Sequence, residues 1–246
     1  MQPVRKERFE IKSFDVDFQQ NLKPSALMQF FQEVASNHAA NLGGGYDVLI
    51  ERGLFWALSR LKVEVIRMPH WGEVIEIETW PCGIEGLFFR RDYIVYDKDQ
   101  QVVIRAVSGW ILVAVANLRP QRPSQLGIAL PSNSGKRALD SFPERITTHT
   151  NLVAFHKTVA YNEIDQNLHV NNTRYLDWAT DCFQMSHYQS YKLAEFTLEF
   201  LSETHWGDEI ELRTSTSDLK SDIEACELIT GTILFKSVME WLSIPL

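Results

Sequence analysis

The chain of 246 residues contains few cysteines, no long apolar run and no excess of basic charge. Its three cysteines, Cys82, Cys182 and Cys226, are odd in number and far apart, which argues against a disulfide framework or a zinc site. We therefore expect buried thiols and a reducing, cytoplasmic compartment. No segment approaches the roughly 20 apolar residues of a membrane-spanning helix. The N-terminal sequence contains acidic residues and resembles neither a signal nor a transit peptide.

The charge composition limits the partners that the chain could bind. Acidic residues number 32 and basic residues 24, for a net charge of -8. This balance argues against nucleic-acid binding, because such binding depends on lysine and arginine neutralising phosphates. Apolar residues at 45% and charged residues at 23% are typical of a folded globular protein.

The sequence contains an internal repeat. Residues 61–80 read LKVEVIRMPHWGEVIEIETW and residues 196–215 read FTLEFLSETHWGDEIELRTS, so they align without a gap at a single offset of 135 (196 − 61). Both copies continue as alternating strand sequence. A helical pattern of apolar residues precedes each copy, at 27–38 in the first half and 175–183 in the second.

A proline-rich segment separates the two copies. Residues 117–143 contain four prolines among serine, asparagine and glycine, a composition typical of a linker. We expect an N-terminal domain at 1–116, a linker at 117–150 and a C-terminal domain at 151–246. Because a sheet with one apolar face must bury that face, each domain is predicted to be an antiparallel sheet wrapped around a long central helix, an α+β fold.

The octet DQNLHVNN at 165–172 concentrates polar groups just before the second helical pattern. In an extended segment the alternate residues Asp165, Asn167 and His169 would share one face. The first half has no histidine at the corresponding position, which we place at Lys23. A structural cap would be expected in both copies, whereas a catalytic group is needed only once. The asymmetry therefore favours a catalytic site.

The order DQNLHVNNTRYLDW, followed by LEFLSET, resembles the acyl-acyl carrier protein thioesterases of plants and bacteria. In the first half, WALSRLKVEVIRMPHWGEVIEIETWP, RRDYIVYD and SGWILV are similar to the N-terminal domain of that family. The resemblance covers nearly the whole chain, from about Phe9 onward. It implies two tandem hotdog domains, of which the second is catalytic.

The resemblance also implies a set of catalytic residues. The family's catalytic aspartate, asparagine and histidine fall on Asp165, Asn167 and His169, and its catalytic glutamate falls on Glu203. Plant members often have a cysteine directly after that glutamate, whereas this chain has Thr204. A cysteine nucleophile is therefore not expected. Hydrolysis needs only water, so no metal and no organic cofactor is expected.

Thioester hydrolysis passes through a tetrahedral oxyanion, which requires positioned hydrogen-bond donors. We expect the backbone N–H groups from Val170 to Asn172 to be available, since the first N–H groups of a helix have no intrahelical acceptor. A carboxylate must then attack the carbonyl group or deprotonate water. We favour Asp165 as the central carboxylate, with Glu203 and His169 activating water.

Other residues near these patterns receive structural interpretations. His70 and His205 precede Trp-Gly at matching positions of the repeat and are expected to form turns. His38, on an apolar helix face, is expected to be a core histidine with a hydrogen-bond partner. Glu163 is expected to be a solvated acid of the loop before the motif.

The substrate would be an acyl chain carried by an acidic protein. The first helix is the more apolar one, and we expect Met28, Phe31 and Val34, with Trp56, to line the acyl tunnel; packing against their own sheet is the alternative. Because this chain is acidic too, binding of acyl carrier protein requires a local basic patch. The candidates for that patch are Arg90, Arg91, Arg119, Arg122, Lys136, Arg137 and Arg174.

Two other functions remain open. A hotdog thioesterase acting on acyl-coenzyme A would need a nucleotide pocket, for which the sequence shows no clear signal. A non-catalytic acyl-binding module would gain little from a polar cluster of four residues. The favoured function is release of free fatty acid from acyl carrier protein, by a monomer with an internal pseudo-dimer or by a homodimer.

Overall fold

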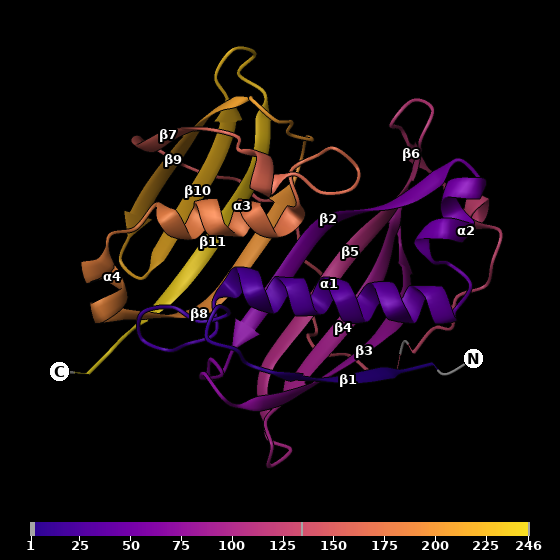
Figure 1. Cartoon of the computed structure of the whole chain (residues 1–246), viewed down its shortest axis with the longest axis horizontal. Coiled ribbons are helices and arrows are strands. Elements are labelled where there is room, and N and C mark those ends of the chain that lie inside the picture. Colours follow the sequence, from indigo (N-terminus) through magenta and orange to yellow (C-terminus); the bar gives the residue numbers. More distant parts are fainter. Residues whose placement is uncertain (1–2, 134, 246) are drawn as a thin grey trace. The chain divides into compact units, whose positions relative to one another are not determined.

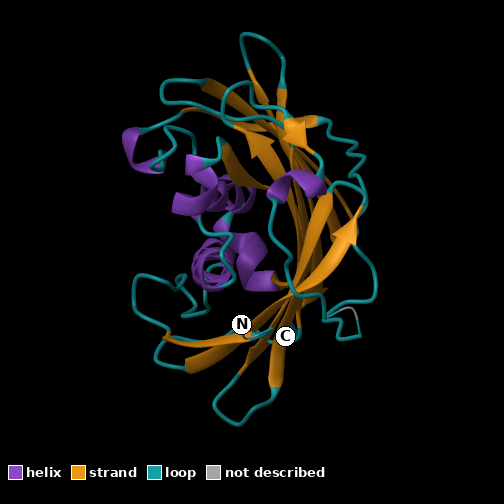
Figure 2. Ribbon diagram, turned by 90° about the vertical axis from the view of Figure 1, so that its right-hand side faces the viewer, coloured by secondary structure: helices purple, strands orange, loops and turns teal. Residues whose placement is uncertain are grey.

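Each half of the chain forms its own unit, in which helices lie against one face of an antiparallel sheet (Figures 1 and 2). The computed structural model describes residues 3–133 and 135–245, and it divides into Met1–Pro143 and Glu144–Leu246. The expected α+β class with two copies of one unit is confirmed. The division falls within residues 117–150, the expected linker. Among the helices of the described residues, none is long and apolar enough to cross a membrane.

The first unit contains a sheet in the order β1-β3-β4-β5-β2, with β6 paired to β5. Its strands are β1 (Arg5–Glu10), β2 (Leu54–Val65), β3 (Val74–Glu85), β4 (Phe88–Tyr96), β5 (Val102–Ala114) and β6 (Pro120–Gln121). Its helices are α1 (Pro24–Asn41), the short α2 (Tyr46–Glu51) and the 3-10 helix η1 (Pro123–Leu126).

The second unit repeats this topology, with a sheet in the order β8-β11-β10-β9-β7. Its strands are β7 (Leu152–Thr158), β8 (Tyr191–Phe200), β9 (Glu209–Ser217), β10 (Lys220–Glu227) and β11 (Ile233–Ser243). Its helices are η2 (Tyr161–Glu163), α3 (Asn172–Asp181) and α4 (Met185–Ser190). Helix α3 has 10 residues against 18 in α1, so it is shorter than the long central helix that we expected.

Helix α1 forms where the sequence pattern predicted it. Pro24 occupies its first turn, where the missing N–H has no intrahelical acceptor to lose. The buried face contains Leu27, Phe31 and Val34, and Phe31 stacks on Tyr93 of β4 with ring centroids 4.6 Å apart. This contact packs helix α1 against its sheet.

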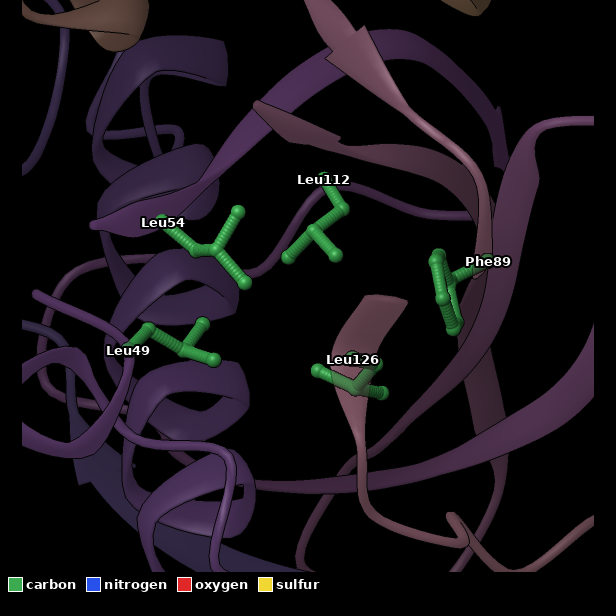
Figure 3. Packing of buried hydrophobic residues seen from close by; sticks show 5 residues of the cluster. All are labelled: Leu49, Leu54, Phe89, Leu112 and Leu126. Carbon is green, nitrogen blue, oxygen red and sulfur yellow. The ribbon is translucent and has the colours of Figure 1, made fainter. Parts of the chain in front are cut away.

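The proline-rich segment packs against the first unit. Leu126 enters a cluster with Leu49, Leu54, Phe89 and Leu112, and Figure 3 shows the five side chains together. Trp56 packs against the same cluster, and its indole N–H donates to the Gly44 carbonyl at 2.9 Å. Farther along the segment, Ala138 and Leu139 are buried as well.

Two arginines of β4 are buried, so their assignment to a surface patch is wrong. Arg90 is 2% exposed and pairs with Asp92 at 2.8 Å; the same carboxylate accepts a hydrogen bond from Ala138 N–H at 2.7 Å. Residues 138–139 therefore cover the face of the sheet that we expected to be open. Arg91 points to the opposite side, where its Nη1 lies 3.0 Å from His38 Nδ1 and burial lowers its pKa. His38 is thus a core histidine with a partner, as predicted.

Candidate active site

The DQNLHV motif forms a tight turn and not an extended segment. The backbone N–H of Asp165 donates to the His169 carbonyl at 2.8 Å, and Leu168 N–H donates to the Asp165 carbonyl at 3.0 Å. Leu168 has a φ of +65°, in the left-handed region. The prediction that alternate residues share one face of an extended segment is therefore wrong.

The Asp165 side chain stabilises this turn. Its Oδ1 accepts a hydrogen bond from the backbone N–H of Asn167 at 2.8 Å, which is an Asx turn. The side chain of Asn167 is exposed and has no hydrogen-bond partner among the residues that the structure describes. The structure thus brings these two residues together through the backbone of Asn167.

The first unit builds the same turn from a different sequence. Asp17 N–H donates to the Asn21 carbonyl at 2.9 Å, and Asp17 Oδ1 accepts from Gln19 N–H at 2.8 Å. Gln20 has a φ of +66°, close to the value of Leu168 in the second unit. The turn itself is therefore a structural element of both copies.

This correspondence corrects the alignment of the two copies. Asn21, and not Lys23, stands opposite His169, at an offset of 148 (169 − 21). The triplet Gln-Asn-Leu occurs in both loops, at 20–22 and at 166–168, and it suggested a register two residues away. The conclusion from the sequence still stands, because the first unit has no imidazole at this position.

A second hydrogen bond brings the turn to the segment that follows strand β8. Val170 N–H donates to the Thr204 carbonyl at 2.8 Å, just as Leu22 N–H donates to Pro69 in the first unit at 2.8 Å. As a result His169 Nε2 lies 3.3 Å from Glu203 Oε2. The first unit has Asn21 and Met68 at these two positions. The imidazole–carboxylate pair is therefore specific to the second unit.

The backbone donors expected at the start of α3 are mostly occupied. Val170 N–H is bonded to Thr204 and Asn171 N–H donates to the Glu163 carbonyl at 2.9 Å, so the prediction is wrong for both. The Asn171 side chain caps the helix by accepting from Thr173 N–H at 3.0 Å. Among the described residues, Asn172 N–H has no intramolecular acceptor, and it remains a candidate oxyanion donor.

Glu163 is buried, so its assignment as a solvated loop acid is wrong. Its carboxylate accepts hydrogen bonds from Trp178 Nε1 at 2.7 Å, from Ala160 N–H at 2.8 Å and from the Lys157 ammonium. Burial alone would raise the pKa of Glu163, but these hydrogen bonds hold it below its usual value of 4.5. Glu163 thus joins strand β7, the motif loop and helix α3.

His205 forms the turn that the repeat predicted and also faces the motif. Its backbone N–H donates to Asp208 Oδ2 at 2.7 Å, as His70 N–H donates to Glu73 at 3.0 Å. The ring of His205 packs edge-on against that of His169, with centroids 5.0 Å apart. One ligand atom each of His169, Glu203 and His205 lies within 4.8 Å of the others, so these three could hold a metal ion.

A buried tyrosine of helix α3 lies beneath the site, at the first position of the helical pattern predicted at 175–183. The Tyr175 hydroxyl donates to Thr204 Oγ1 at 2.9 Å. Burial, together with the negative charges of Glu203, Asp165 and Asp208, raises the pKa of Tyr175 to about 12. The hydroxyl therefore stays protonated at neutral pH.

The thiols are poor candidates for a nucleophile. Burial raises the pKa of Cys82 to about 11 and that of Cys182 to about 12, and it also raises that of Cys226. Because the thiolate is the reactive form, all three should be inert near neutral pH. Within the described parts of the chain, no contact joins any of them to His169 or Glu203.

The first unit contains a small cavity between α1 and the sheet. Met28 and Phe31 line it, together with Gln32, Leu58, Leu61, Tyr93, Ser108 and Trp110. Its volume of about 10 Å³ suits roughly one water molecule, so an acyl chain would have to widen it. Val34 lies on the same buried helix face but outside this lining. Trp56 packs against the cluster of Leu49, Leu54, Phe89, Leu112 and Leu126.

A larger hollow of about 860 Å³ lies at the β9–β10 end of the second unit and includes no motif residue. Its charged side chains include Asp218, Asp222 and Glu240 beside Lys220. Three carboxylates against one ammonium make it a poor site for phosphates, and hence for the nucleotide of coenzyme A.

Comparison with known proteins identifies relatives along nearly the whole chain. The model of the acyl-ACP thioesterase N-terminal domain matches residues 2–125, and that of the acyl-ACP thioesterase C-terminal domain matches residues 147–241. A chloroplastic dodecanoyl-[acyl-carrier-protein] hydrolase of Cinnamomum camphora is 29% identical over 97% of this chain and 67% of its own length. A chloroplastic oleoyl-acyl carrier protein thioesterase of Arabidopsis thaliana is 27% identical over 87% of this chain and 64% of its own length.

Solved structures show the same fold. The crystal structure of an acyl-ACP thioesterase from Bacteroides thetaiotaomicron superposes with a TM-score of 0.87, at 26% identity and covering 98% of each chain. The 12:0-ACP thioesterase of Umbellularia californica also gives 0.87, at 24% identity and covering 99% of each chain. The expected pair of tandem hotdog domains is thereby confirmed.

Glu163→Gln should destabilise the second unit in a pH-dependent manner. Hydrogen bonds to a buried charged group are worth about 1.5–3 kcal/mol, so we expect a loss of that order at neutral pH. Because the folded state lowers the pKa of Glu163, its stabilisation is complete above the usual value of 4.5 and disappears as pH falls through the folded value. Urea denaturation between pH 7 and pH 3 would measure this.

The matched control is Asp15→Asn, which replaces the corresponding buried acid of the first unit, an acceptor from Lys12 N–H at 2.8 Å. A difference between wild type and Glu163→Gln that stays constant over the whole pH range would contradict the assignment.

Proposed function

This chain belongs to the acyl-ACP thioesterase family, and from that premise we propose that it hydrolyses fatty acyl-acyl carrier protein and releases free fatty acid. The observation that carries the proposal is the His169–Glu203 pair, with its nitrogen and oxygen 3.3 Å apart. The same backbone in the first unit carries Asn21 and Met68, which can perform no acid–base chemistry.

In the proposed reaction, Glu203 orients His169 and His169 activates water. A distance of 3.3 Å is slightly longer than an ideal hydrogen bond, as is common before a substrate binds. In the tautomer that donates Nε2–H to Glu203, Nδ1 of His169 removes a proton from water. The hydroxide adds to the carbonyl carbon, the C–S bond breaks, and the imidazolium returns the proton to the leaving thiolate.

The remaining motif residues would stabilise charge during this reaction. The Asn172 N–H and the exposed Asn167 amide are the donors that we assign to the oxyanion. One oxygen of Asp165 maintains the turn, and its negative charge acts on the same Tyr175 hydroxyl as that of Glu203. We assign Asp165 to stabilising the imidazolium that forms on His169.

The acyl chain would enter the first unit. Met28 and Phe31 already line a cavity under α1, and Val34 lies on the next turn of the same buried face. Widening this cavity along the helix would create an apolar tunnel. Each buried methylene contributes about 0.8 kcal/mol, so the depth of such a tunnel would strongly select chain length.

The carrier protein would bind the first unit, because charge is divided unequally between the units. Residues 144–246 contain 7 basic and 16 acidic residues, a net charge of −9 (7 − 16), whereas residues 1–143 contain 17 and 16, a net charge of +1 (17 − 16). Residues 100–139 contain no acid at all. An acidic partner should therefore avoid the second unit and approach this segment.

Two of the basic candidates remain after their contacts are considered. Lys136 pairs with Glu78, Arg137 with Glu85 and Arg174 with Asp177. Arg119 and Arg122 are exposed, and no carboxylate among the described residues pairs with either. We assign the carrier-protein patch to these two arginines.

His169→Ala and Glu203→Gln should each lower hydrolysis by roughly 10²–10⁴-fold, the usual contribution of a general base, while leaving the fold intact. Asp165→Asn keeps an oxygen that can accept the hydrogen bond from Asn167 N–H, so any activity that this variant loses would measure the contribution of the negative charge. Asp17→Asn, the same change in the first unit, should retain activity. Release of fatty acid from acyl carrier protein is the measurement.

A folded Asp165→Asn variant with normal turnover would restrict Asp165 to shaping the turn. Full activity of the folded His169→Ala and Glu203→Gln variants would refute the proposed site. Replacement of each cysteine by alanine should largely preserve activity, so loss of activity on thiol alkylation without unfolding would revive a cysteine mechanism.

Met28→Ala and Phe31→Ala should shift the released fatty acids toward longer chains, because each lengthens or widens the cavity. About 0.8 kcal/mol per methylene corresponds to roughly a fourfold change in preference per carbon. Met239→Ala, a buried methionine of the second unit, is the matched control and should leave the profile unchanged. If the profile stays constant in stable variants at Met28, Phe31 and Val34, the tunnel lies elsewhere.

Charge reversal of the patch, Arg119→Glu with Arg122→Glu, should raise KM for acyl-acyl carrier protein by roughly tenfold or more. It should spare any activity on acyl-coenzyme A, which does not present the carrier protein. Lys98→Glu reverses an exposed charge elsewhere on the first unit and should change neither value much. Equal effects on both substrates would argue against a carrier-specific patch.

A further inference from the structure

Three side chains with metal-binding chemistry converge at the motif. One ligand atom each of His169, Glu203 and His205 lies within 4.8 Å of the other two. Two imidazoles and one carboxylate suit late first-row divalent cations such as Zn²⁺, whereas Mg²⁺ and Ca²⁺ prefer oxygen ligands.

The spacing approaches that of a metal site before any ion binds. Ligand bonds of about 2.0–2.2 Å in a tetrahedral zinc site place neighbouring donor atoms roughly 3.3–3.6 Å apart. His169 Nε2 and Glu203 Oε2 already lie 3.3 Å apart. The three side chains are partly exposed, with 25%, 36% and 56% of the His169, Glu203 and His205 side chains accessible. They are therefore free to rotate by the further ångström or so that closure requires.

The electrostatic surroundings favour a cation at this point. Asp208 accepts from the His205 backbone and lies 3.8 Å from its Nδ1. The charges of Glu203, Asp165 and Asp208 all act on the hydroxyl of Tyr175, which lies beneath the site. A carboxylate that accepts a hydrogen bond from a histidine ligand raises the basicity of that ligand and fixes its orientation.

The first unit provides an internal comparison. Its equivalent turn places Asn21 in a bridge with His70, and Met68 stands two residues before that histidine. Of these three residues only His70 is a strong ligand, because the amide of Asn21 and the thioether of Met68 bind divalent zinc weakly. The same backbone therefore carries a ligand set in one copy only.

We propose that His169, Glu203 and His205 form a site for one Zn²⁺ ion per chain, and that the ion inhibits the enzyme. Zinc on His169 Nε2 requires the tautomer that carries its proton on Nδ1, so the Nδ1 lone pair that removes a proton from water is lost, and zinc also takes the Glu203 oxygen that orients the ring. Loss of a general base accounts for roughly 10²-fold or more in rate, so we expect inhibition of that order at saturating zinc. The inhibition rests on the proposed function, but the binding does not.

The binding test uses the full chain without an affinity tag, in a buffer without chelators. Calorimetric titration with Zn²⁺ should give one site per chain, and Co²⁺ should produce the visible absorption of a tetrahedral complex. His205→Ala should abolish this site, because it removes one of three protein ligands, whereas His70→Ala should retain it. Because His205 and His70 occupy equivalent turns, the comparison of these two variants distinguishes the proposed site from unspecific binding to surface histidines.

The inhibition test measures release of fatty acid with and without Zn²⁺, with Mg²⁺ as the control cation. Wild type and His70→Ala should lose activity in zinc and recover it on addition of EDTA. The activity that His205→Ala retains should be the same with and without the ion. If the chain does not hydrolyse the thioester at all, the calorimetric stoichiometry still decides the metal site.

A gain of binding provides the strongest test. Asn21→His combined with Met68→Glu installs the second unit's ligand set on the equivalent backbone beside His70, so the titration should reach two zinc ions per chain. A stoichiometry that remains at one would overturn the claim that these positions suffice. Absence of zinc binding by the wild type, equal binding by His205→Ala, or activation by zinc would overturn the proposal itself.

Discussion

The arrangement of the site depends on one backbone hydrogen bond, from Val170 N–H to the Thr204 carbonyl at 2.8 Å. It joins the motif turn to the chain segment that follows strand β8, two parts of the sequence more than thirty residues apart (204 − 170 = 34). Without it, His169 and Glu203 would belong to separate loops. The sheet fixes one of these segments and helix α3 fixes the other. The bond therefore brings side chains from two stable elements together in one polar site.

The same bond in the first unit shows that the framework forms without the polar residues of the second unit. Leu22 N–H donates to Pro69 at 2.8 Å, and the Asp17 turn repeats the Asp165 turn almost bond for bond. Only the side chains carried by this frame differ. The proposed site is therefore a matter of a few positions on a duplicated backbone, and fold alone would not reveal which copy holds them.

The sequence was sufficient for the elements and for the asymmetry between the copies, because strand alternation, the helical stripe and the repeated His-Trp-Gly are local patterns. It failed where a contact between distant segments decides the outcome. Arg90 looks like a surface residue until residues 138–139 cover it, and Glu163 looks solvated until Trp178 and Lys157 meet its carboxylate. The alignment of the two motif loops was wrong for another reason. Both loops contain the triplet Gln-Asn-Leu, and the turn geometry that gives the correct alignment is visible only in the structure.

The left-handed residue at the tip of each turn has a further consequence. Leu168 and Gln20 both adopt φ values near +65°, at +65° and +66°, although neither is glycine. A side chain in this region costs on the order of 1 kcal/mol and persists only where surrounding bonds determine the backbone. The surrounding hydrogen bonds therefore hold the loop that carries His169 in one slightly strained backbone conformation. The chain supplies the conformational free energy of this arrangement once, when it folds, so little reorganisation of the loop remains to be done at each turnover.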